Sequence, residues 1–508
     1  TPPRRAGWFA LALASAWALH PLQVSAVLYA VQRLQTMGTL FLVLALVAYL
    51  HARSAQMQGA SGKSGMLMAV LAWALALGCK EDSVLLPLYT LALELTVLRF
   101  SATDPRTAVL LRRSYLVAAT AGMLLYVFWV VPHYWQWEAH AGRDFSTLER
   151  LLTQPRVLCM YLGQILLPLP QHMPFYYDWL QPSRGLLQPW TTLPAILVVL
   201  GLLGLAWATR QRLPLFALGI FLFFGAHAIA SNVVALELAF EHRNHFALVG
   251  AVLAVGSLLA FASRRLRLSP APQAALCVAA LAVLACATLL RSHTWSNGIT
   301  LLAATAKAAP TSARAWVDLC DALFVAGGGV TADNPNLDGA IEACKSGTVN
   351  VPDSLNSPAL LVALKTLRGD VTPEDWALFQ QRLGSVRMSW DNIRAPLILV
   401  YYADLGVAVD KPQLLKAMAT LDRRAPLSPS TLASIGGTVM NTLDEPDLAM
   451  PYFTKAIEKA PPGDPFAWDL GAELRQKGRP DLAAGVELVG QRRRSLGMCD
   501  PPEHKPSP

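Results

Sequence analysis

Apolar residues form long runs over the first 291 residues of the chain. Nine runs are centred on residues 8–20, 36–52, 65–79, 83–98, 114–132, 190–208, 213–232, 247–263 and 273–291. Some are shorter than the ~20 residues that a bilayer core needs, but neighbouring apolar residues can extend them. A segment in lipid must stay helical, because only a helix satisfies its backbone N–H and C=O groups internally. The pattern therefore predicts a polytopic bundle of about nine transmembrane helices over residues 1–291.

The loops between these runs differ in charge from one side to the other. The Lys and Arg residues on one side are Arg4, Arg5, Arg53, Lys63, Arg99, Arg106, Arg112, Arg113, Arg210, Arg212, Arg264, Arg265 and Arg267, whereas the short loops opposite hold only Arg33, Lys80 and Arg243. Because positively charged short loops stay in the cytoplasm, the first side is predicted to be cytoplasmic. The chain then leaves the last helix at Arg291 on the outer side, and the C-terminal half is extracytoplasmic.

Residues 292–497 have a different pattern, in which charges recur every few residues and apolar positions follow helical spacing. The sequence Pro-Asp-Leu-Ala at 446–449 recurs at 480–483. This offset is the period of a tetratricopeptide helix pair. About three or more stacked pairs are needed to bury a continuous core, so divergent units between 316 and 425 are predicted to complete a soluble α-solenoid. The proline-containing tail, 498–508, is predicted to be disordered.

Composition narrows the class of protein. The 508 residues are 54% hydrophobic and 15% charged, with a mean hydropathy of +0.38, which excludes a disordered chain. Residues 1–291 contain 21 Lys and Arg against 10 Asp and Glu, whereas residues 292–508 contain 21 against 24. The basic excess belongs to the apolar half, where loops beside lipid head groups explain it. Membrane lipid is the expected partner, and no nucleic-acid partner is predicted.

The seven cysteines lack the CxxC or Cys/His spacing of a metal site, so no metal-binding residues are predicted. Cys320 and Cys344 both lie in the predicted extracytoplasmic part, where a disulfide can persist. Two buried free thiols are an equally good interpretation of this pair.

Polar and ionisable residues are concentrated in the predicted outer loops. They include His20, Gln32, Arg33, Lys80, Glu81, Asp82, Glu241, His242 and Arg243. Ionisable groups at a membrane boundary are costly unless they are paired or hydrated, so they are candidates for a functional site. The alternative is that charges such as Lys80 and Glu81 merely end helices and extend to the interface.

The longest predicted outer region covers residues 133–189. Within it, residues 147–169 are predicted to form a largely apolar helix along the membrane interface. The following aromatic, proline-broken segment 171–179, which contains Asp178, suits a loop that covers a cavity. An ordinary interfacial belt of Tyr and Trp explains the same segment equally well.

The outer cations have the chemistry of a phosphate site. Arg33, Lys80 and Arg243 would hold the phosphate of a polyprenyl-phosphate sugar and stabilise the negative charge that develops as it departs. A carboxylate within hydrogen-bond reach must deprotonate the acceptor hydroxyl. Glu81 and Glu241 are candidates for this catalytic role or for orienting the cations and the sugar. Both have an alternative interpretation as structural ion-pair partners at helix ends.

The order of these motifs resembles that of a known family. His20-Pro21, Gln32-Arg33 before a spanning helix, Lys80-Glu81 before the next helix pair, and Glu241-His242-Arg243-Asn244 at a helix start are followed by tetratricopeptide-like repeats. This order is similar to that of bacterial membrane proteins related to the TMTC O-mannosyltransferases, which are GT-C glycosyltransferases. The resemblance covers essentially the whole chain.

The resemblance implies a GT-C-like domain that uses a lipid-phosphate sugar on its outer face. In the family an acid in the first outer loop is the usual catalytic base, and no such loop precedes the first apolar run here. We therefore expect that the sequence is truncated at its N-terminus and that the main base lies in the absent loop. No cofactor is predicted beyond the donor substrate. The expected substrate-binding residues are Arg33, Lys80, Arg243, His20, Gln32, His242 and Asp178, the last toward the acceptor.

The predicted function is sugar transfer from an isoprenoid-phosphate carrier to a periplasmic protein or glycan. The protein would lie in a bacterial inner membrane, with the periplasmic repeat domain recruiting the acceptor. Two alternatives remain open. One is a catalytically inactive, membrane-tethered scaffold whose repeats bind a partner. The other is a ligase that transfers a whole lipid-linked glycan.

Overall fold

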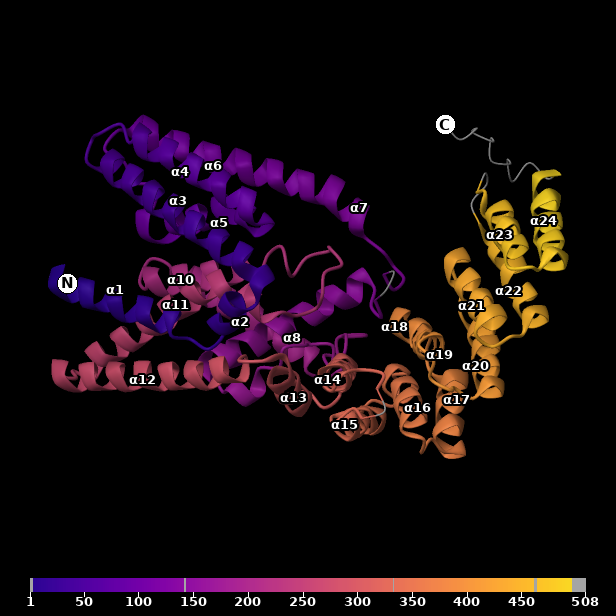
Figure 1. The fold of residues 1–508 in the computed structure, drawn as a ribbon. Coiled ribbons are helices and arrows are strands. Elements are labelled where there is room, and N and C mark those ends of the chain that lie inside the picture. Colours follow the sequence, from indigo (N-terminus) through magenta and orange to yellow (C-terminus); the bar gives the residue numbers. More distant parts are fainter. Residues whose placement is uncertain (1–2, 141–142, 332, 461–463, 496–508) are drawn as a thin grey trace. The chain divides into compact units, whose positions relative to one another are not determined.

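The computed structural model describes residues 3–140, 143–331, 333–460 and 464–495, and its regular structure is helical throughout (Figure 1). No β-strand is present in these ranges, which confirms the predicted all-α class. The chain divides into two compact units, residues 1–312 and 313–508. The predicted disordered tail, 498–508, lies outside the described residues.

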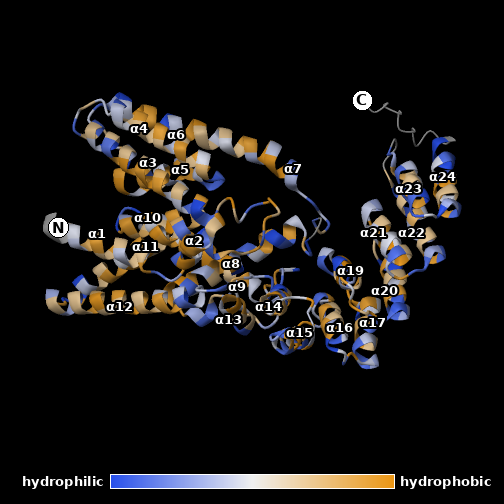
Figure 2. Cartoon of the chain, in the orientation of Figure 1, coloured by the Kyte–Doolittle hydropathy of each residue, from blue (hydrophilic) through white to orange (hydrophobic). Residues whose placement is uncertain are grey.

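Each of the nine predicted apolar runs overlaps a helix of the first unit. These helices are α1 (Pro3–Ala18), α3 (Arg33–Met57), α4 (Lys63–Cys79), α5 (Leu86–Leu93), α6 (Pro105–Leu125), α9 (Thr192–Thr209), α10 (Pro214–Ala226), α11 (Asn244–Arg265) and α12 (Pro270–Thr294). Colouring by hydropathy shows apolar residues along most of their length (Figure 2). The π-helical turn Tyr126–Val130 joins α6 to the short α7 (Val131–Tyr134).

Five segments in the described part of the chain are long and apolar enough to cross a membrane. They are Ala30–Met57, Pro105–Tyr134, Thr192–Thr209, Glu241–Arg265 and Pro270–Thr294. Helices α1, α4 and α10 contain shorter apolar segments. The structure is therefore that of a protein with several helices suited to a membrane, and five of the nine predicted spans have the full length that a bilayer core requires.

The loops of the first unit gather at two opposite ends of the helices. At one end, Arg99 Nη2 donates to the Gln211 carbonyl at 2.9 Å, and the Thr103 amide donates to the Gln56 carbonyl at 3.2 Å. At the other end, the start of α3 packs against the turn after α4. The 25 residues of α3 separate these ends by roughly 37 Å at 1.5 Å per residue. These contacts place the loops around residues 56, 99–103 and 211 at one end of α3 and the turn after α4 at the other.

Arg53, one of the charges predicted on the first side, is fully buried. Its Nε lies 2.6 Å from Glu94 Oε1, and its Nη2 donates to the Ser101 carbonyl at 2.7 Å. Tyr49 also donates to Glu94, at 2.7 Å. Arg53 is therefore half of a buried ion pair rather than a charge exposed on a loop.

Short elements complete the first unit at its other end. They are α2 (Gln23–Leu28), η1 (Ala30–Gln32), η2 (Glu81–Leu85), α8 (Thr147–Leu166), η5 (Pro170–His172), η6 (Glu241–Arg243) and α13 (Gly298–Ala308). Helix α8 begins with a capping box, in which Ser146 and Glu149 bind each other's backbone amides. Its apolar face, including Val157, Leu158 and Ile165, is buried in the core of the unit. The helix therefore forms inside the segment predicted to be helical from sequence.

The second unit consists largely of helices that pack in sequential pairs. Pro446 and Pro480, which begin the two copies of the repeated sequence, are the first residues of two helices that pack on each other. The pairs in the described residues are α14 (Ala313–Ala326) with α15 (Leu337–Asn350), α16 (Asn356–Arg368) with α17 (Pro373–Ser385), α21 (Pro429–Asn441) with α22 (Pro446–Lys459), and α23 (Phe466–Gln476) with α24 (Pro480–Ser495). Helices α18 (Trp390–Arg394), α19 (Leu397–Asp404) and α20 (Lys411–Arg424) lie between the second and third pairs in sequence.

Two arginines near the C-terminal ends of their helices donate hydrogen bonds to carbonyls in the last turn of an earlier helix. Arg382 of α17 donates to the Thr348 carbonyl of α15 at 2.7 Å, and Arg424 of α20 donates to the Leu383 carbonyl of α17 at 2.6 Å. These carbonyls belong to last helical turns, where no intrahelical donor remains and the helix dipole favours a cation. These bonds tie α17 to the end of α15 and α20 to the end of α17.

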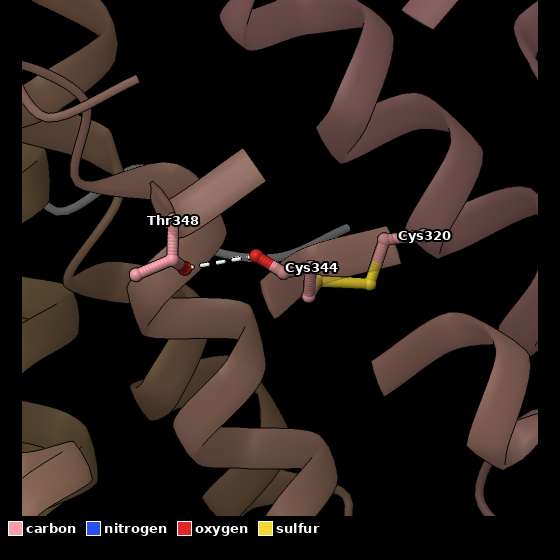
Figure 3. Close-up of a disulfide and its surroundings, with 3 residues drawn as sticks. All are labelled: Cys320, Cys344 and Thr348. Atoms are coloured by element: carbon pink, nitrogen blue, oxygen red, sulfur yellow. Dashed lines mark hydrogen bonds between the residues drawn. A yellow bond between two sulfur atoms is a disulfide. The ribbon is translucent and has the colours of Figure 1, made fainter. Parts of the chain in front are cut away.

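A disulfide joins the first pair of the second unit. Cys320 of α14 and Cys344 of α15 are bonded (Figure 3). The sequence allowed either a disulfide or two buried free thiols at these positions, and the structure contains the disulfide. Four further cysteines of the described residues, Cys79, Cys159, Cys277 and Cys286, are free.

Candidate functional site

The turn that carries Lys80 packs tightly on the start of α3. A Cβ placed on Gly38 would lie 3.1 Å from Lys80 Cβ, so the close approach depends on glycine at position 38. Nearby, Gln35 Nε2 donates to Asp82 Oδ2 at 2.8 Å. Burial raises the pKa of Asp82, although the hydrogen bond from Gln35 and the charge of Lys80 act in the opposite direction. This turn therefore holds a cation beside a carboxylate that accepts a proton more readily than an exposed one.

The turn that begins α11 packs on the segment that precedes α3. His245 Nδ1 lies 2.5 Å from Gln23 Oε1, and Trp17 Nε1 donates to the His245 carbonyl at 2.9 Å. Helix α2 packs against η6 as well. The His-Pro, Lys-Glu and Glu-His-Arg segments singled out from sequence thus lie at one end of the apolar helices.

Two of the three predicted phosphate-binding cations are near enough to His242 for their charges to reach it, although no hydrogen bond or ion pair joins the three side chains in the described part of the chain. The charges of Arg243 and Lys80 both act on the His242 ring. We call these three residues the Lys80 cluster. Arg33 is exposed at the first position of α3, where its carbonyl accepts from Thr36. No side-chain contact joins Arg33 to the cluster in the described residues.

Several buried polar atoms beside the Lys80 turn have no hydrogen-bond partner among the described residues. They are Gln32 Oε1, Thr39 Oγ1 and Ser83 Oγ. A buried polar group without a partner costs about 1–3 kcal/mol. Such atoms at the start of α3 and in η2 are places where a ligand or water supplies the missing bond. Gln32 is the predicted substrate-binding residue that belongs to this set.

Glu241 is buried and bound to a residue that the sequence analysis did not select. Arg291 Nη2 lies 2.6 Å and 2.5 Å from its two carboxylate oxygens, and Arg291 Nη1 donates to the Met173 carbonyl at 2.7 Å. Tyr177 donates to Glu241 at 3.1 Å. Of the two roles that the sequence allowed for Glu241, this arrangement is the structural ion pair. Its partner is Arg291 and not the adjacent Arg243.

Tyr177 links this ion pair to α8. Its hydroxyl accepts from Gln164 Nε2 at 2.9 Å. Burial and the neighbouring Glu241 carboxylate raise the pKa of Tyr177 well above its usual value, so its hydroxyl stays protonated and serves as a donor.

The remaining predicted residues have simpler surroundings. His20 is buried, with Nε2 3.2 Å from the Ile165 carbonyl and Nδ1 accepting from the Leu22 amide at 3.2 Å. It therefore fixes the turn before α2 against α8. Asp178 accepts a hydrogen bond from Ser312 at 2.5 Å. Glu81 is exposed beside Lys80 in the chain.

The sequence analysis also missed Arg150, which binds the loop before η6. Arg150 is fully buried on α8 and donates to the carbonyls of Ala230, Asn232 and Leu236. Burial, followed by the charges of Arg243 and Arg143, lowers the pKa of Arg150 to about 9, so it stays protonated at neutral pH. A sequence signal was present, because polar residues at 150, 154 and 161 recur along one face of an otherwise apolar helix.

Gln154 and Tyr161 of that face bind the same loop. Gln154 Nε2 donates to the Leu238 carbonyl at 3.1 Å, and the Tyr161 hydroxyl exchanges bonds of 2.9 Å and 2.7 Å with the Phe240 carbonyl and amide. The polar face of α8 therefore sets the path of the backbone that leads to Arg243.

The site so described offers cations and carboxylates but no cluster of metal ligands. No group of three His, Cys, Asp or Glu residues that could hold a metal ion is found in the described ranges. The chemistry available is the binding of an anion and the movement of a proton. Comparison of the chain with protein-family models, curated proteins and solved structures finds no match.

Proposed function

We propose that this protein is an integral membrane glycosyltransferase of the GT-C type. It transfers a sugar from a polyprenyl-phosphate-linked donor to a protein or glycan in the bacterial periplasm. The observation that supports this proposal best is that the turn of Lys80 packs on the start of α3 while the turn of Arg243 packs on α2, the helix that precedes α3, so both lie at the end of the helices that holds predicted outer loops. The unpartnered oxygen of Gln32 nearby supports the presence of a ligand.

The chemistry follows from the charges of the cluster. Lys80 and Arg243 bind the donor phosphate and stabilise the negative charge that it gains as the bond to the sugar breaks. The acceptor hydroxyl must lose its proton as it attacks the sugar. Asp82 suits that step among the described carboxylates near Lys80, because its raised pKa makes it a better proton acceptor. Glu241, with both oxygens on Arg291, holds the turn in place instead.

The second unit has the role of recruiting the acceptor. Its sequential helix pairs and the offset of 34 residues between 446 and 480 support a tetratricopeptide solenoid, a fold that binds partners along extended surfaces. The Cys320–Cys344 disulfide supports an oxidising compartment, such as the periplasm.

The test uses a strain that lacks the gene and is complemented with variants. Periplasmic and surface glycoconjugates are analysed by mass spectrometry. We expect a sugar-bearing species to disappear in the deletion strain, to return with the wild-type chain, and to stay absent with Lys80→Ala, Arg243→Ala or Asp82→Asn. Lys63→Ala, an exposed lysine at the opposite end of α4, is the matched control and should restore it. Identical glycoconjugates in wild-type and deletion strains would refute the proposed glycosyltransferase activity.

One observation favours the alternative of a tethered scaffold. Glu241, the acid of the Glu-His-Arg motif, is fully engaged with Arg291 and is not available for proton transfer. A scaffold would keep its partner binding in the second unit when Lys80 and Asp82 are both replaced. If Lys80→Ala removes the sugar-bearing species but leaves partner binding intact, the protein acts as the enzyme and not only as a scaffold.

A further inference from the structure

Helix α8 buries polar side chains and exposes apolar residues. The polar residues with fewer charged neighbours in water than in the fold, all of them buried, are Thr147, Arg150, Thr153, Gln154 and Gln164. The residues of α8 that are exposed are Leu148, Gly163 and Leu166. A helix on the surface of a soluble domain has the opposite pattern, with its polar residues toward water. The outward side of α8 therefore suits an apolar medium.

The exposed apolar side of α8 continues into the residues that follow it and has a counterpart in the turn before α9. We call these two segments together the leucine surface. It consists of Leu166, Leu167, Leu169, Leu186, Leu187 and Trp190, which are between 44% and 71% exposed. Single exposed leucines are common on proteins. A concentration of large apolar residues on the surface instead marks a contact with a membrane, a ligand or another protein.

The distribution of charge favours lipid as the occupant. No Asp, Glu, Lys or Arg occurs between residues 157 and 177 or between residues 185 and 209. The partly exposed charges of α8 lie earlier in the helix, where Glu149 pairs with Arg184 and Arg156 donates to the Gln181 carbonyl. Protein interfaces are bordered by a polar rim, whereas lipid acyl chains need no charged neighbours. The uncharged surroundings of the leucine surface match acyl chains better.

The backbone at the end of α8 is also suited to lipid. The Leu167 amide donates to the Gly163 carbonyl at 2.9 Å, and the Leu169 amide donates to the Leu167 carbonyl at 2.8 Å. Residues 168 and 170 are prolines, which have no N–H group. Each residue from 167 to 170 thus either donates within the chain or lacks a donor. An unpaired N–H group is costly in hydrocarbon, and this turn avoids that cost.

Helix α8 runs along α9 toward the middle of that helix. Thr153 Oγ1 accepts from the Ser183 amide at 2.8 Å, and Ser183 Oγ lies 2.8 Å from the hydroxyl of Thr192, the first residue of α9. Farther along α8, Cys159 Sγ lies 3.8 Å from the Ala195 carbonyl. The contacts thus advance into α9, a segment long and apolar enough to cross a membrane. Helix α8 continues to Leu166, roughly 10 Å beyond Cys159 at 1.5 Å per residue.

We propose that the leucine surface inserts into the lipid bilayer beside α9. Acyl chains surround Leu166, Leu167 and Leu169, while Leu187 and Trp190 lie at the border with the head groups, where Trp is favoured. The sequence predicted a helix along the interface, and the advance of α8 along α9 carries its C-terminal end into the leaflet instead. The inference is independent of sugar transfer.

The lipid contact bears on the backbone that leads to Arg243. The buried side of α8 holds that loop through Arg150, Gln154 and Tyr161. The helix therefore stands between the loop and the bilayer, and its insertion sets the depth of the loop.

The test places a nitroxide label on the leucine surface. The full chain, with the cysteines outside the Cys320–Cys344 bond replaced by Ala, receives Leu167→Cys or Leu187→Cys and is reconstituted into phosphatidylcholine vesicles. Electron paramagnetic resonance then compares collisions of the label with oxygen, which concentrates in lipid, and with a water-soluble nickel chelate. The ratio of oxygen to nickel accessibility should be higher at Leu167 than at Leu187.

Two labelled positions provide the references. Leu200→Cys, at a 59% exposed position of α9, reports lipid, and Val349→Cys, at a 72% exposed position of α15, reports water. Both labels on the leucine surface should give ratios above that at Val349, and Leu167 should approach Leu200. A ratio at Leu167 as low as that at Val349 would overturn the inference. Low accessibility to both reagents would show that protein covers the surface and would overturn it as well. If Leu167→Cys does not fold, Leu187→Cys in the separate turn decides the outcome.

Discussion

Arg291 and Glu241, 50 residues apart, form an ion pair in which each side chain is only 3% exposed. The pair joins the C-terminal part of α12 to the turn that begins α11. That turn carries His242 and Arg243, so the position of Arg243 depends on a contact made near the C-terminal end of the apolar helix α12.

Breaking this pair should destabilise the first unit strongly. Arg291→Gln leaves a carboxylate buried without its cation, and such a change costs about 3–5 kcal/mol. The measurement is thermal unfolding of the full chain in detergent. Arg264→Gln, at an exposed position of α11, should change stability by less than about 0.5 kcal/mol. Replacing both partners, Arg291→Met with Glu241→Leu, should recover much of the loss, and a double variant as unstable as Arg291→Gln would contradict the ion-pair interpretation.

Arg53 and Glu94 provide a second test, at the opposite end of the helices. Arg53→Lys keeps the positive charge but loses the fork that reaches Glu94, Gln56 and Ser101 together. We expect Arg53→Lys to lower the free energy of unfolding by more than about 1 kcal/mol, in line with the loss of a charge-assisted hydrogen bond. The orientation of the chain in the membrane should stay unchanged. Arg106→Ala, an exposed arginine at the start of α6, is the control. Wild-type stability of Arg53→Lys would show that only its charge matters.

The disulfide of the second unit can be checked chemically. Cys320 and Cys344 should resist alkylation in unfolded, unreduced protein and react after reduction, whereas Cys79, Cys159, Cys277 and Cys286 should react in both cases. Replacing both with Ser should lower the stability of the second unit by about 2–4 kcal/mol, because the bond constrains the unfolded chain. Mass spectrometry of alkylated peptides provides the measurement, and alkylation of Cys320 without reductant would disprove the bond.

Asp375 should make the stability of α17 depend on pH. Burial alone raises its pKa, but hydrogen bonds from Lys365 and Thr372 outweigh this and lower the pKa below its usual value. Because the folded pKa is depressed, its stabilisation is present above the unfolded pKa of about 3.9 and is lost as pH falls through the folded value.

Hydrogen exchange of the α17 amides tests this, with Asp375→Asn compared with wild type at equal pH. Wild type should be better protected at pH 6, and the difference should shrink toward pH 3. An equal difference at both pH values would indicate that the carboxylate does not titrate in this range. Glu374→Gln, a neighbouring change in the same first turn, is the matched control.

Local sequence patterns determined much of the architecture. Long apolar runs form helices in a membrane protein because backbone groups in lipid must be satisfied within the segment, and each of the nine runs overlaps a helix. The offset of 34 residues likewise marked two helices, beginning at Pro446 and Pro480, that pack on each other. The turn of Lys80 packs on the start of α3, and the turn of Arg243 packs on α2.

The partners of the charged residues were decided only by the tertiary structure. Glu241 pairs with Arg291 rather than with the adjacent Arg243, Arg53 pairs with Glu94, and Arg143 joins Arg150 and Arg243 at Glu237. Hydropathy and helical period depend on neighbours within one segment, so they can be predicted from sequence. A buried ion pair depends on which segments pack side by side and at what depth, and those contacts span tens of residues that local patterns do not relate.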